Sequence, residues 1–161
     1  MADKTLKKRA YEYKLTRVRE AAPSRKIDAP ELAYAYWREV IACAGWYQEN
    51  REHVAVLLLN TRHNIEGHAL VAVGSINECV AGPREILAPV LCGCAYGFIL
   101  LHNHPSGDPS PSSADRALTR RISEGAALLD VKLVDHVIAG RADPGDPGRE
   151  PYFSFREMGL I

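Results

Sequence analysis

The 161-residue sequence contains no long apolar run, no excess of charge of either sign and only four cysteines. No stretch approaches the roughly 20 apolar residues that cross a bilayer, which argues against a membrane-spanning helix. The start, MADKTLKKRAYEYK, lacks the apolar segment of a secretion signal, so we expect a cytoplasmic protein without a membrane partner. The length suits one compact domain whose core needs no disulfide staples.

The four cysteines, Cys43, Cys79, Cys92 and Cys94, form no CxxC pair. In a cytoplasmic chain this spacing favours small, buried, reduced side chains over disulfides or thiolate metal ligands. The sequence also lacks a His-x-Glu followed by PCxxC, which disfavours a zinc-dependent nucleobase deaminase.

Charge is balanced overall, with 20 Lys and Arg against 20 Asp and Glu, but it is unevenly distributed along the chain. Residues 1–26 carry nine Lys or Arg and three acids, so the remainder is net acidic. A basic arm of this kind could contact nucleic acid. Because only Tyr11 and Tyr13 are interleaved with these charges, a solvated terminus is the favoured interpretation. Nothing in the sequence indicates the oligomeric state.

Hydrophobic periodicity predicts strands that alternate with helices. We expect strands over 11–19, 53–60, 66–74, 96–101, 131–139 and 152–155, and helices over 30–44, 83–94 and 112–129. Polar turn residues between the second and third of these strands indicate a hairpin. The order of elements predicts an α/β fold built on a mixed sheet.

The beginning of the chain is expected to be an arm with an edge strand, followed by a linker over residues 21–30. Asp28 is placed to cap the first helix. The apolar face predicted for that helix consists of Leu32, Ala35, Tyr36, Val40 and Cys43.

The most informative stretch is LLHNHPSGDPSPSSAD, residues 100–115. If the strand before it stays extended, His102 and His104 point to the same side, because side chains alternate along a strand. Two neutral imidazoles can bind one zinc ion, and a hydrolytic zinc site usually has three protein ligands. The proline-rich loop could return the chain to the start of the next helix, where the helix dipole favours Asp115 as the third ligand.

Ser112 and Asp115 also have a simpler explanation. The segment Ser-Ser-Ala-Asp at a helix start resembles a capping box with Asp in place of Glu. Taken singly, two histidines in a loop are usually structural or exposed. The combination of an apolar strand, two alternating histidines, a returning loop and an acid at a helix start favours a metal site, with capping left open at Ser112 and Asp115.

The ordered pattern of His102, His104, Ser112 and Asp115 resembles the JAMM motif of MPN/JAB metalloproteases. The full string is similar to the bacterial RadC family, as are EHVAVLLLN at 52–60, PREI at 83–86 and DHVIAG at 135–140. The resemblance covers about residues 31–140. It implies a JAB/MPN-type, cytidine-deaminase-like α/β domain, here assigned to residues 31–161 after an arm over 1–30.

Two features depart from that family. Full-length RadC-like proteins commonly carry an N-terminal helix-hairpin-helix module, for which the residues before the JAB-like part leave no room, so the chain resembles a short form. The loop before Pro83 reads Cys-Val-Ala-Gly where the family often has a His.

The resemblance implies a zinc site with His102, His104 and Asp115 as metal ligands. It implies that Glu52 is the general acid/base, taking a proton from a zinc-bound water and passing it to the leaving amine. Ser112 matches the serine near the oxyanion, to which a hydroxyl can donate.

The function implied is that of a zinc-dependent peptidase or isopeptidase, with a peptide or ubiquitin-like protein as substrate. The alternative is a RadC-like DNA-repair accessory that binds partners or nucleic acid with little turnover. We interpret Asp135 and His136 as a buried structural pair; the alternative makes Asp135 an acceptor for a ligating imidazole.

Overall fold

The structure, a computed structural model, describes residues 24–74, 81–142, 145–146, 148 and 150–161. Its elements are α1 (Pro30–Tyr36), the π-helical turn η1 (Trp37–Ile41), β1 (His53–Leu59), β2 (Ile65–Val73), α2 (Pro83–Cys92), β3 (Gly97–Asn103), α3 (Ser113–Leu128), β4 (Lys132–Ala139) and β5 (Tyr152–Ser154). The strand expected over 11–19 and most of the basic arm lie outside the described residues.

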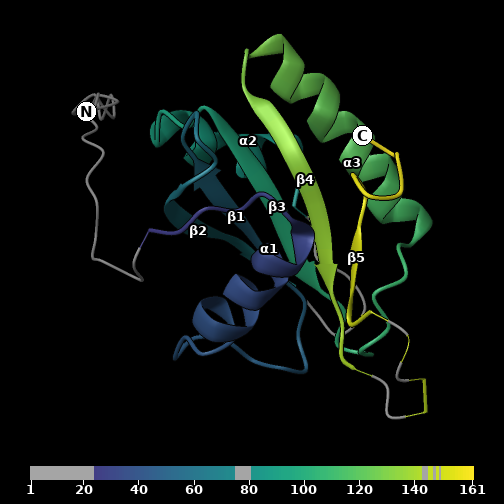
Figure 1. Ribbon diagram of the computed structural model, residues 1–161. Coiled ribbons are helices and arrows are strands. Elements are labelled where there is room, and N and C mark those ends of the chain that lie inside the picture. The colour runs from purple at the N-terminus through teal and green to yellow at the C-terminus, as the bar shows by residue number, and fades with distance from the viewer. Residues whose placement is uncertain (1–23, 75–80, 143–144, 147, 149) are drawn as a thin grey trace, which may run out of the picture.

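The five strands form one mixed sheet in the order β2-β1-β3-β4-β5. β1 and β2 form the expected antiparallel hairpin, β1 also pairs antiparallel with β3, and β5 pairs antiparallel with β4. β3 and β4 are parallel, and α3 makes the crossover that parallel neighbours require. Helix α1 lies on one face of the sheet, and α2 and α3 cover the other (Figure 1). The mixed α/β fold is therefore confirmed and is consistent with the JAB/MPN type.

β3 is the central strand, and all seven of its residues are buried. Ile99 and Leu101 pack toward α1, whereas Phe98 and Leu100 pack toward α2 and α3. The same alternation sends the side chain of His102 to the face of α3, at the point where the strand ends.

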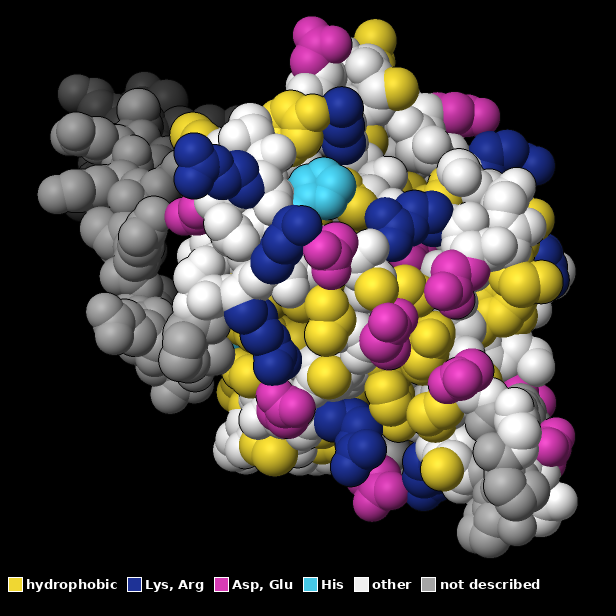
Figure 2. All heavy atoms as spheres, in the orientation of Figure 1, with side chains coloured by type: hydrophobic (Ala, Val, Ile, Leu, Met, Phe, Trp, Pro, Cys, Tyr) yellow, Lys and Arg dark blue, Asp and Glu magenta, His cyan; other side chains and the backbone are white. Residues whose placement is uncertain are grey.

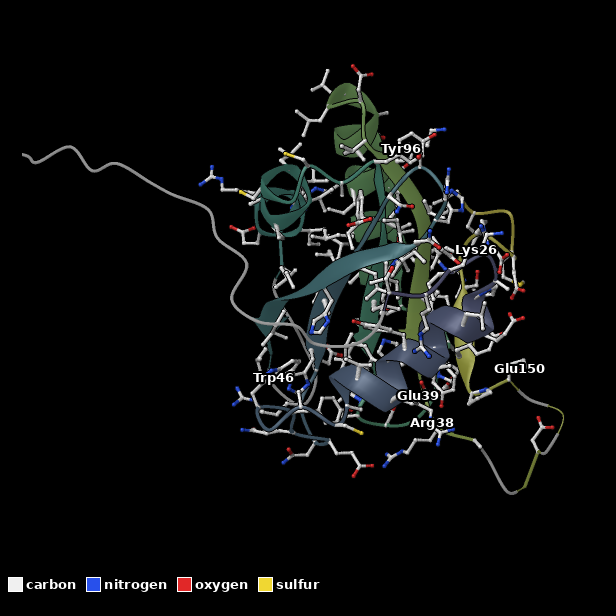
Figure 3. All side chains as sticks on the ribbon, turned by 60° about the vertical axis from the view of Figure 1, so that its left-hand side comes forward. Lys26, Arg38, Glu39, Trp46, Tyr96 and Glu150 are labelled. Atoms are coloured by element: carbon white, nitrogen blue, oxygen red, sulfur yellow. The ribbon has the colours of Figure 1, made fainter. Side chains whose placement is uncertain are left out.

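Figure 3 shows the two ends of the sheet, with Tyr96 at one end and Trp46 at the other. Tyr96 directly precedes β3, so β3 starts at the first end. The Trp46 ring lies 5.9 Å from that of His53, the first residue of β1, and β1 is antiparallel to β3. His102 therefore lies at the Trp46 end of the sheet.

The first helical segment differs from the helix predicted over residues 30–44. A short α-helix passes into the π-helical turn, which ends at Ile41. The wider π turn changes the phase of the side chains. Beyond this turn Ile41 is buried in place of Cys43, which is exposed. Before it, Tyr36 of the predicted apolar face is buried as expected, whereas Leu32 is exposed.

Two expectations about the start of this segment were wrong. Asp28 does not cap α1, because the N-cap residue is Ala29 and the Asp28 carboxylate lies 2.8 Å from the Lys26 ammonium. Residues 24–28 are also more than a linker. Lys26 forms a β-bridge with Asn64, and Ile27 is part of the core on the α1 face.

The prediction of buried cysteines was also wrong for the three that the structure describes. Cys43, Cys92 and Cys94 are exposed, and Cys79 lies outside the described residues. Helix α2 buries Ile86, Leu87 and Val90, which leaves its last residue on the solvent side. The helix ends at Cys92, so Cys94 lies in the turn before β3 rather than in a helix. None of the described helices is long and apolar enough to cross a membrane.

Candidate metal centre

The two histidines of the loop lie side by side where β3 ends. The extended path continues past Asn103, because the N–H of His104 donates to the carbonyl of Ala139 at 3.0 Å. The Nε2 atoms of His102 and His104 are 3.1 Å apart. The predicted placement of both imidazoles on one side of the strand is thus confirmed.

The returning loop brings Asp115 to these histidines. Its two carboxylate oxygens lie 3.2 Å from Nε2 of His102 and 3.5 Å from Nε2 of His104. Each of the three residues offers one ligand atom, and these atoms all lie within 4.8 Å of one another. The structure therefore brings together the three residues whose role as metal ligands the sequence predicted.

Contacts with the end of β4 determine the path of the loop. Gly107 has a φ of 85°, which favours glycine. Its carbonyl accepts from the N–H of Arg141 at 2.9 Å, and the Arg141 guanidinium donates to the carbonyl of Pro105 at 2.6 Å. A Cβ on Gly140 would collide with the Gly107 carbonyl. The glycine that ends the DHVIAG segment thus lets the loop pack closely against the sheet.

The capping interpretation of Ser112 and Asp115 is also confirmed. Ser112 is the N-cap of α3, and its hydroxyl accepts from the N–H of Asp115 at 3.1 Å. The Asp115 carboxylate accepts in return from the N–H and the hydroxyl of Ser112, at 2.8 Å and 2.6 Å. The capping box holds the carboxylate in the orientation that faces both imidazoles, so the two explanations of these residues hold together.

The donor set fits a zinc ion. Nδ1 of His104 lies 2.8 Å from the carbonyl of Asp108, which can only accept, so Nδ1 carries the hydrogen and a neutral His104 has a lone pair at Nε2. Ligands about 2.0–2.1 Å from a tetrahedral zinc ion lie about 3.3 Å from one another. The 3.1 Å between the two Nε2 atoms and the 3.2 Å from Nε2 of His102 to one Asp115 oxygen are close to that value, and one ligand atom from each residue lies within 4.8 Å of the others.

The pKa values of His104 and Asp115 are both shifted from their ordinary values. Burial opposes the raised pKa of His104, but the Asp115 carboxylate and the Asp108 carbonyl favour its protonated form. Burial likewise opposes the lowered pKa of Asp115, but the two imidazoles and the Ser112 hydroxyl favour its ionised form. The Asp115 carboxylate is therefore ionised at neutral pH, and its negative charge faces both imidazoles.

Glu52 lies at the same end of the sheet. It directly precedes β1, and in the β1–β3 register Val54 pairs with His102, so continuing the pattern places Glu52 across from His104. The half-buried Glu52 carboxylate contributes electrostatically to the raised pKa of His104. The structure thus brings Glu52 to the cluster, although its catalytic role stays a prediction.

Asn103 holds the backbone on both sides of Glu52. Its side-chain oxygen accepts from the N–H of His53 at 2.9 Å, and its amide nitrogen donates to the carbonyl of Arg51 at 3.0 Å. The residue between the two histidines therefore fixes the peptide groups that flank Glu52. We did not single out Asn103 from the sequence, where its position inside His-x-His was the only available signal.

His136 is buried, as expected of the structural pair, but its contact with the candidate ligand His102 was missed in the sequence. It is fully buried, with its two ring nitrogens 2.9 Å from Nδ1 of His102 and 2.7 Å from the hydroxyl of Thr119. Burial, and next the neighbouring His102, lower its pKa well below the ordinary value, so the ring is neutral. His136 therefore contacts the candidate ligand His102 directly, in addition to its structural contact with Asp135.

The Asp135 carboxylate has its hydrogen-bond partners on β4, β5 and the following turn. It accepts from the N–H of His136, the hydroxyl of Ser154 and the N–H of Arg156, at 2.7 Å, 2.7 Å and 3.1 Å. These partners connect β4 to β5 and to the turn that follows it. The structural interpretation of Asp135 agrees with this arrangement.

Comparison with known proteins places the chain in a family. The profile of the RadC-like JAB domain matches residues 27–160. The chain belongs to the RadC-like JAB domain family. The match starts four residues before the domain boundary expected from the sequence, and it includes the buried Ile27.

Several relatives of this RadC-like JAB domain carry the name UPF0758 protein. The one from Chlorobaculum parvum is 37% identical over 138 residues, which cover 86% of this chain and 56% of the relative. The one from Thermotoga maritima is 38% identical over 136 residues, covering 84% and 55%. The chain thus spans about half the length of the curated relatives it matches, and their names state no activity.

Proposed function

We propose that this RadC-like JAB domain is a zinc-dependent hydrolase that cleaves peptide or isopeptide bonds. The observation that carries the proposal is the cluster of His102, His104 and Asp115, in which two imidazole nitrogens and a carboxylate oxygen lie within 4.8 Å of one another. Two neutral ligands and one anion would leave a bound dication with net positive charge. Such a site suits hydrolysis rather than purely structural binding, where four protein ligands are the rule.

A zinc ion held by these three residues would supply a Lewis acid that polarises a carbonyl and lowers the pKa of water. The residues of the chain account for the remaining steps. Glu52 accepts a proton from the attacking water and returns it to the leaving amine, as a positioned carboxylate can. Its place opposite His104 and the hydrogen bonds of Asn103 to both flanking residues support this role.

Ser112 is proposed to donate to the oxyanion that develops on the substrate carbonyl. Its hydroxyl donates to the Asp115 carboxylate, and its oxygen accepts from the Asp115 N–H. Turning the hydrogen from the carboxylate to an oxyanion would leave the helix cap in place, because the cap uses the oxygen alone. Capping and catalysis are therefore compatible at this residue.

Two partner classes follow from the sequence resemblance. The preferred substrate is a peptide or a ubiquitin-like protein, since the proposed chemistry releases an amine. The alternative is a DNA-maintenance accessory that binds without turnover. On the face that carries α1, Figure 2 shows acidic and basic side chains interspersed over the described residues, unlike the one-signed basic patch of a nucleic-acid surface.

The test is a cleavage screen on the full chain, purified without a metal-affinity tag and supplied with zinc. The substrates are a mixed peptide library and a matched set in which the bond runs through a lysine ε-amine, both read by mass spectrometry. We expect wild-type cleavage that Glu52→Gln reduces by about 10²–10⁴-fold while zinc binding is retained.

Two results would contradict the proposal. Equal cleavage by wild type and Glu52→Gln would remove Glu52 from the chemistry. A zinc-loaded protein that cleaves neither substrate set, yet binds duplex DNA with an affinity that falls steeply with salt, would favour the accessory function.

A further inference from the structure

A line of hydrogen bonds runs from the metal centre into the interior between β4 and α3. His136 on β4 lies beside β3, and in the parallel register Ile138 pairs with His102. The ring of His136 fills the space between His102 and Thr119 of α3, and both it and Thr119 are almost completely buried. Because no water reaches these groups, each must satisfy the other.

The direction of these hydrogen bonds follows from one hydroxyl. Thr119 donates its single hydrogen to the backbone carbonyl of Asp115 at 2.6 Å. Its oxygen can then only accept from His136, so Nδ1 of His136 carries a hydrogen. In a neutral imidazole the other nitrogen has a bare lone pair, and Nε2 of His136 therefore accepts from Nδ1–H of His102.

These hydrogen bonds affect His102, one of the three candidate metal ligands. A neutral His102 that carries its hydrogen on Nδ1 must present a lone pair at Nε2, which faces His104 and Asp115. We propose that Thr119 and His136 are positioning residues that fix the tautomer and ring orientation of His102 for metal binding. This inference rests on the proposed function, because it assigns the residues a purpose at the same metal site.

Two further observations support a positioning role for Thr119 and His136. The line of bonds starts at the backbone of Asp115 and returns to its carboxylate, so it links the ligand on α3 to the ligand on β3. The ring of Phe155 stacks on His136 with centroids 4.6 Å apart and planes 9° apart. The His136 ring is thereby held in plane while both of its nitrogens are engaged.

Partners of this kind around a metal ligand change affinity by about 10–100-fold when they are removed. Thr119 offers a matched pair of substitutions. Thr119→Val keeps the shape and removes the hydroxyl, whereas Thr119→Ser keeps the hydroxyl and removes a methyl group. The proposal predicts that the first weakens zinc binding and that the second does not.

The experiment has two readouts on the full chain. Zinc affinity is measured by competition with a chelator, and histidine tautomers are measured by long-range ¹H–¹⁵N NMR on zinc-free protein. We expect hydrogens on Nδ1 of His102 and His136 in the wild type. We expect Thr119→Val to lose this tautomer at His102 and to bind zinc about 10–100-fold more weakly, with Thr119→Ser close to the wild type.

Wild-type zinc affinity in a folded Thr119→Val, or a hydrogen on Nε2 of His136 in the wild type, would overturn the inference. If Thr119→Val does not fold, His136→Gln and His136→Leu replace it. Gln keeps an acceptor toward His102 and should bind zinc more tightly than Leu, and equal affinities would contradict the proposal. Absence of zinc binding in the wild type would overturn the proposed function, whereas the tautomers, measured without zinc, still decide the hydrogen-bond order.

Discussion

The two ends of β3 are equally buried but chemically opposite. At the end near Tyr96, the strand carries apolar side chains on both faces, from Phe98 to Leu101. At the end near Trp46 it carries His102 and Asn103, which are 5% and 4% exposed. One strand thus passes from an ordinary apolar core into a polar interior within its last two residues.

The difference shows how this fold tolerates a polar interior. At the apolar end, removal of apolar surface from water stabilises the strand, and other apolar side chains of suitable size would serve. At the polar end, burial costs free energy unless every group finds a partner. Nδ1 of His102 and both polar atoms of Asn103 have such partners within the protein. Nε2 of His102 faces His104 and Asp115, where a bound zinc ion would be its partner. The apolar end of β3 stabilises the fold, whereas the polar end positions the side chains of the candidate metal centre.

Asp115→Asn should have the largest effect of these substitutions. The effect is a loss of zinc affinity at the polar end of β3. It keeps an acceptor for the capping box but removes the negative charge that faces both imidazoles. We expect zinc affinity to fall by more than the roughly 100-fold typical of a partner outside the ligand set. Chelator competition measures it, with Asp108→Asn as the control, because the Asp108 carboxylate accepts from the Ser110 N–H instead. Equal losses in both variants would mean a general charge effect.

Leu100→Ala makes the matching change at the apolar end. Leu100 is fully buried between the sheet and the helices on the α3 face. A cavity of this kind lowers the free energy of unfolding by about 2–5 kcal/mol, which urea titration would measure. Folded Leu100→Ala should still bind one zinc ion per chain. Loss of zinc from the folded variant would show that the two ends are not independent.

Asn103→Leu tests how the polar end holds Glu52. The substitution keeps the volume but leaves the His53 N–H and the Arg51 carbonyl without their partners. We expect the free energy of unfolding to fall by about 1–3 kcal/mol. Hydrolysis should also fall while zinc affinity stays unchanged, because Asn103 touches the flanks of Glu52 rather than the ligands. A drop in zinc affinity without loss of cleavage would contradict this role.

Ser112→Ala should have the smallest effect on the free energy of unfolding. It removes the N-cap of α3, which is worth about 0.5–2 kcal/mol in the free energy of unfolding, and one hydrogen bond to Asp115. Ser113→Ala changes the neighbouring hydroxyl outside the cap and is the matched control in thermal unfolding. Identical melting temperatures would mean that the cap contributes nothing measurable.

The parts of the site that follow from local spacing could be predicted from the sequence. The alternation along β3 placed His102 and His104 together, and the start of α3 placed Ser112 and Asp115. Glu52 came only from the resemblance, because strand pairing far along the chain brings it to the histidines. Nothing in the sequence around Glu52 distinguishes it from the other Asp and Glu residues.

The residues that were missed depend on how elements pack together. His136 reaches His102 only through the β3–β4 register, and Thr119 reaches His136 only because α3 docks there. Beyond Tyr36, the predicted apolar face of the first helix was wrong for a different reason. Helical periodicity assumes a constant turn, and the turn changes at Trp37.

The most direct test of the central claim is the zinc content of the wild-type protein. The chain would be purified without a metal-affinity tag, given zinc, dialysed and measured by mass spectrometry beside His104→Ala. The geometry of the three ligands predicts about one zinc ion per wild-type chain and its loss in the variant. Wild-type protein that retains no zinc, or His104→Ala that retains as much as the wild type, would contradict a metal centre at the end of β3.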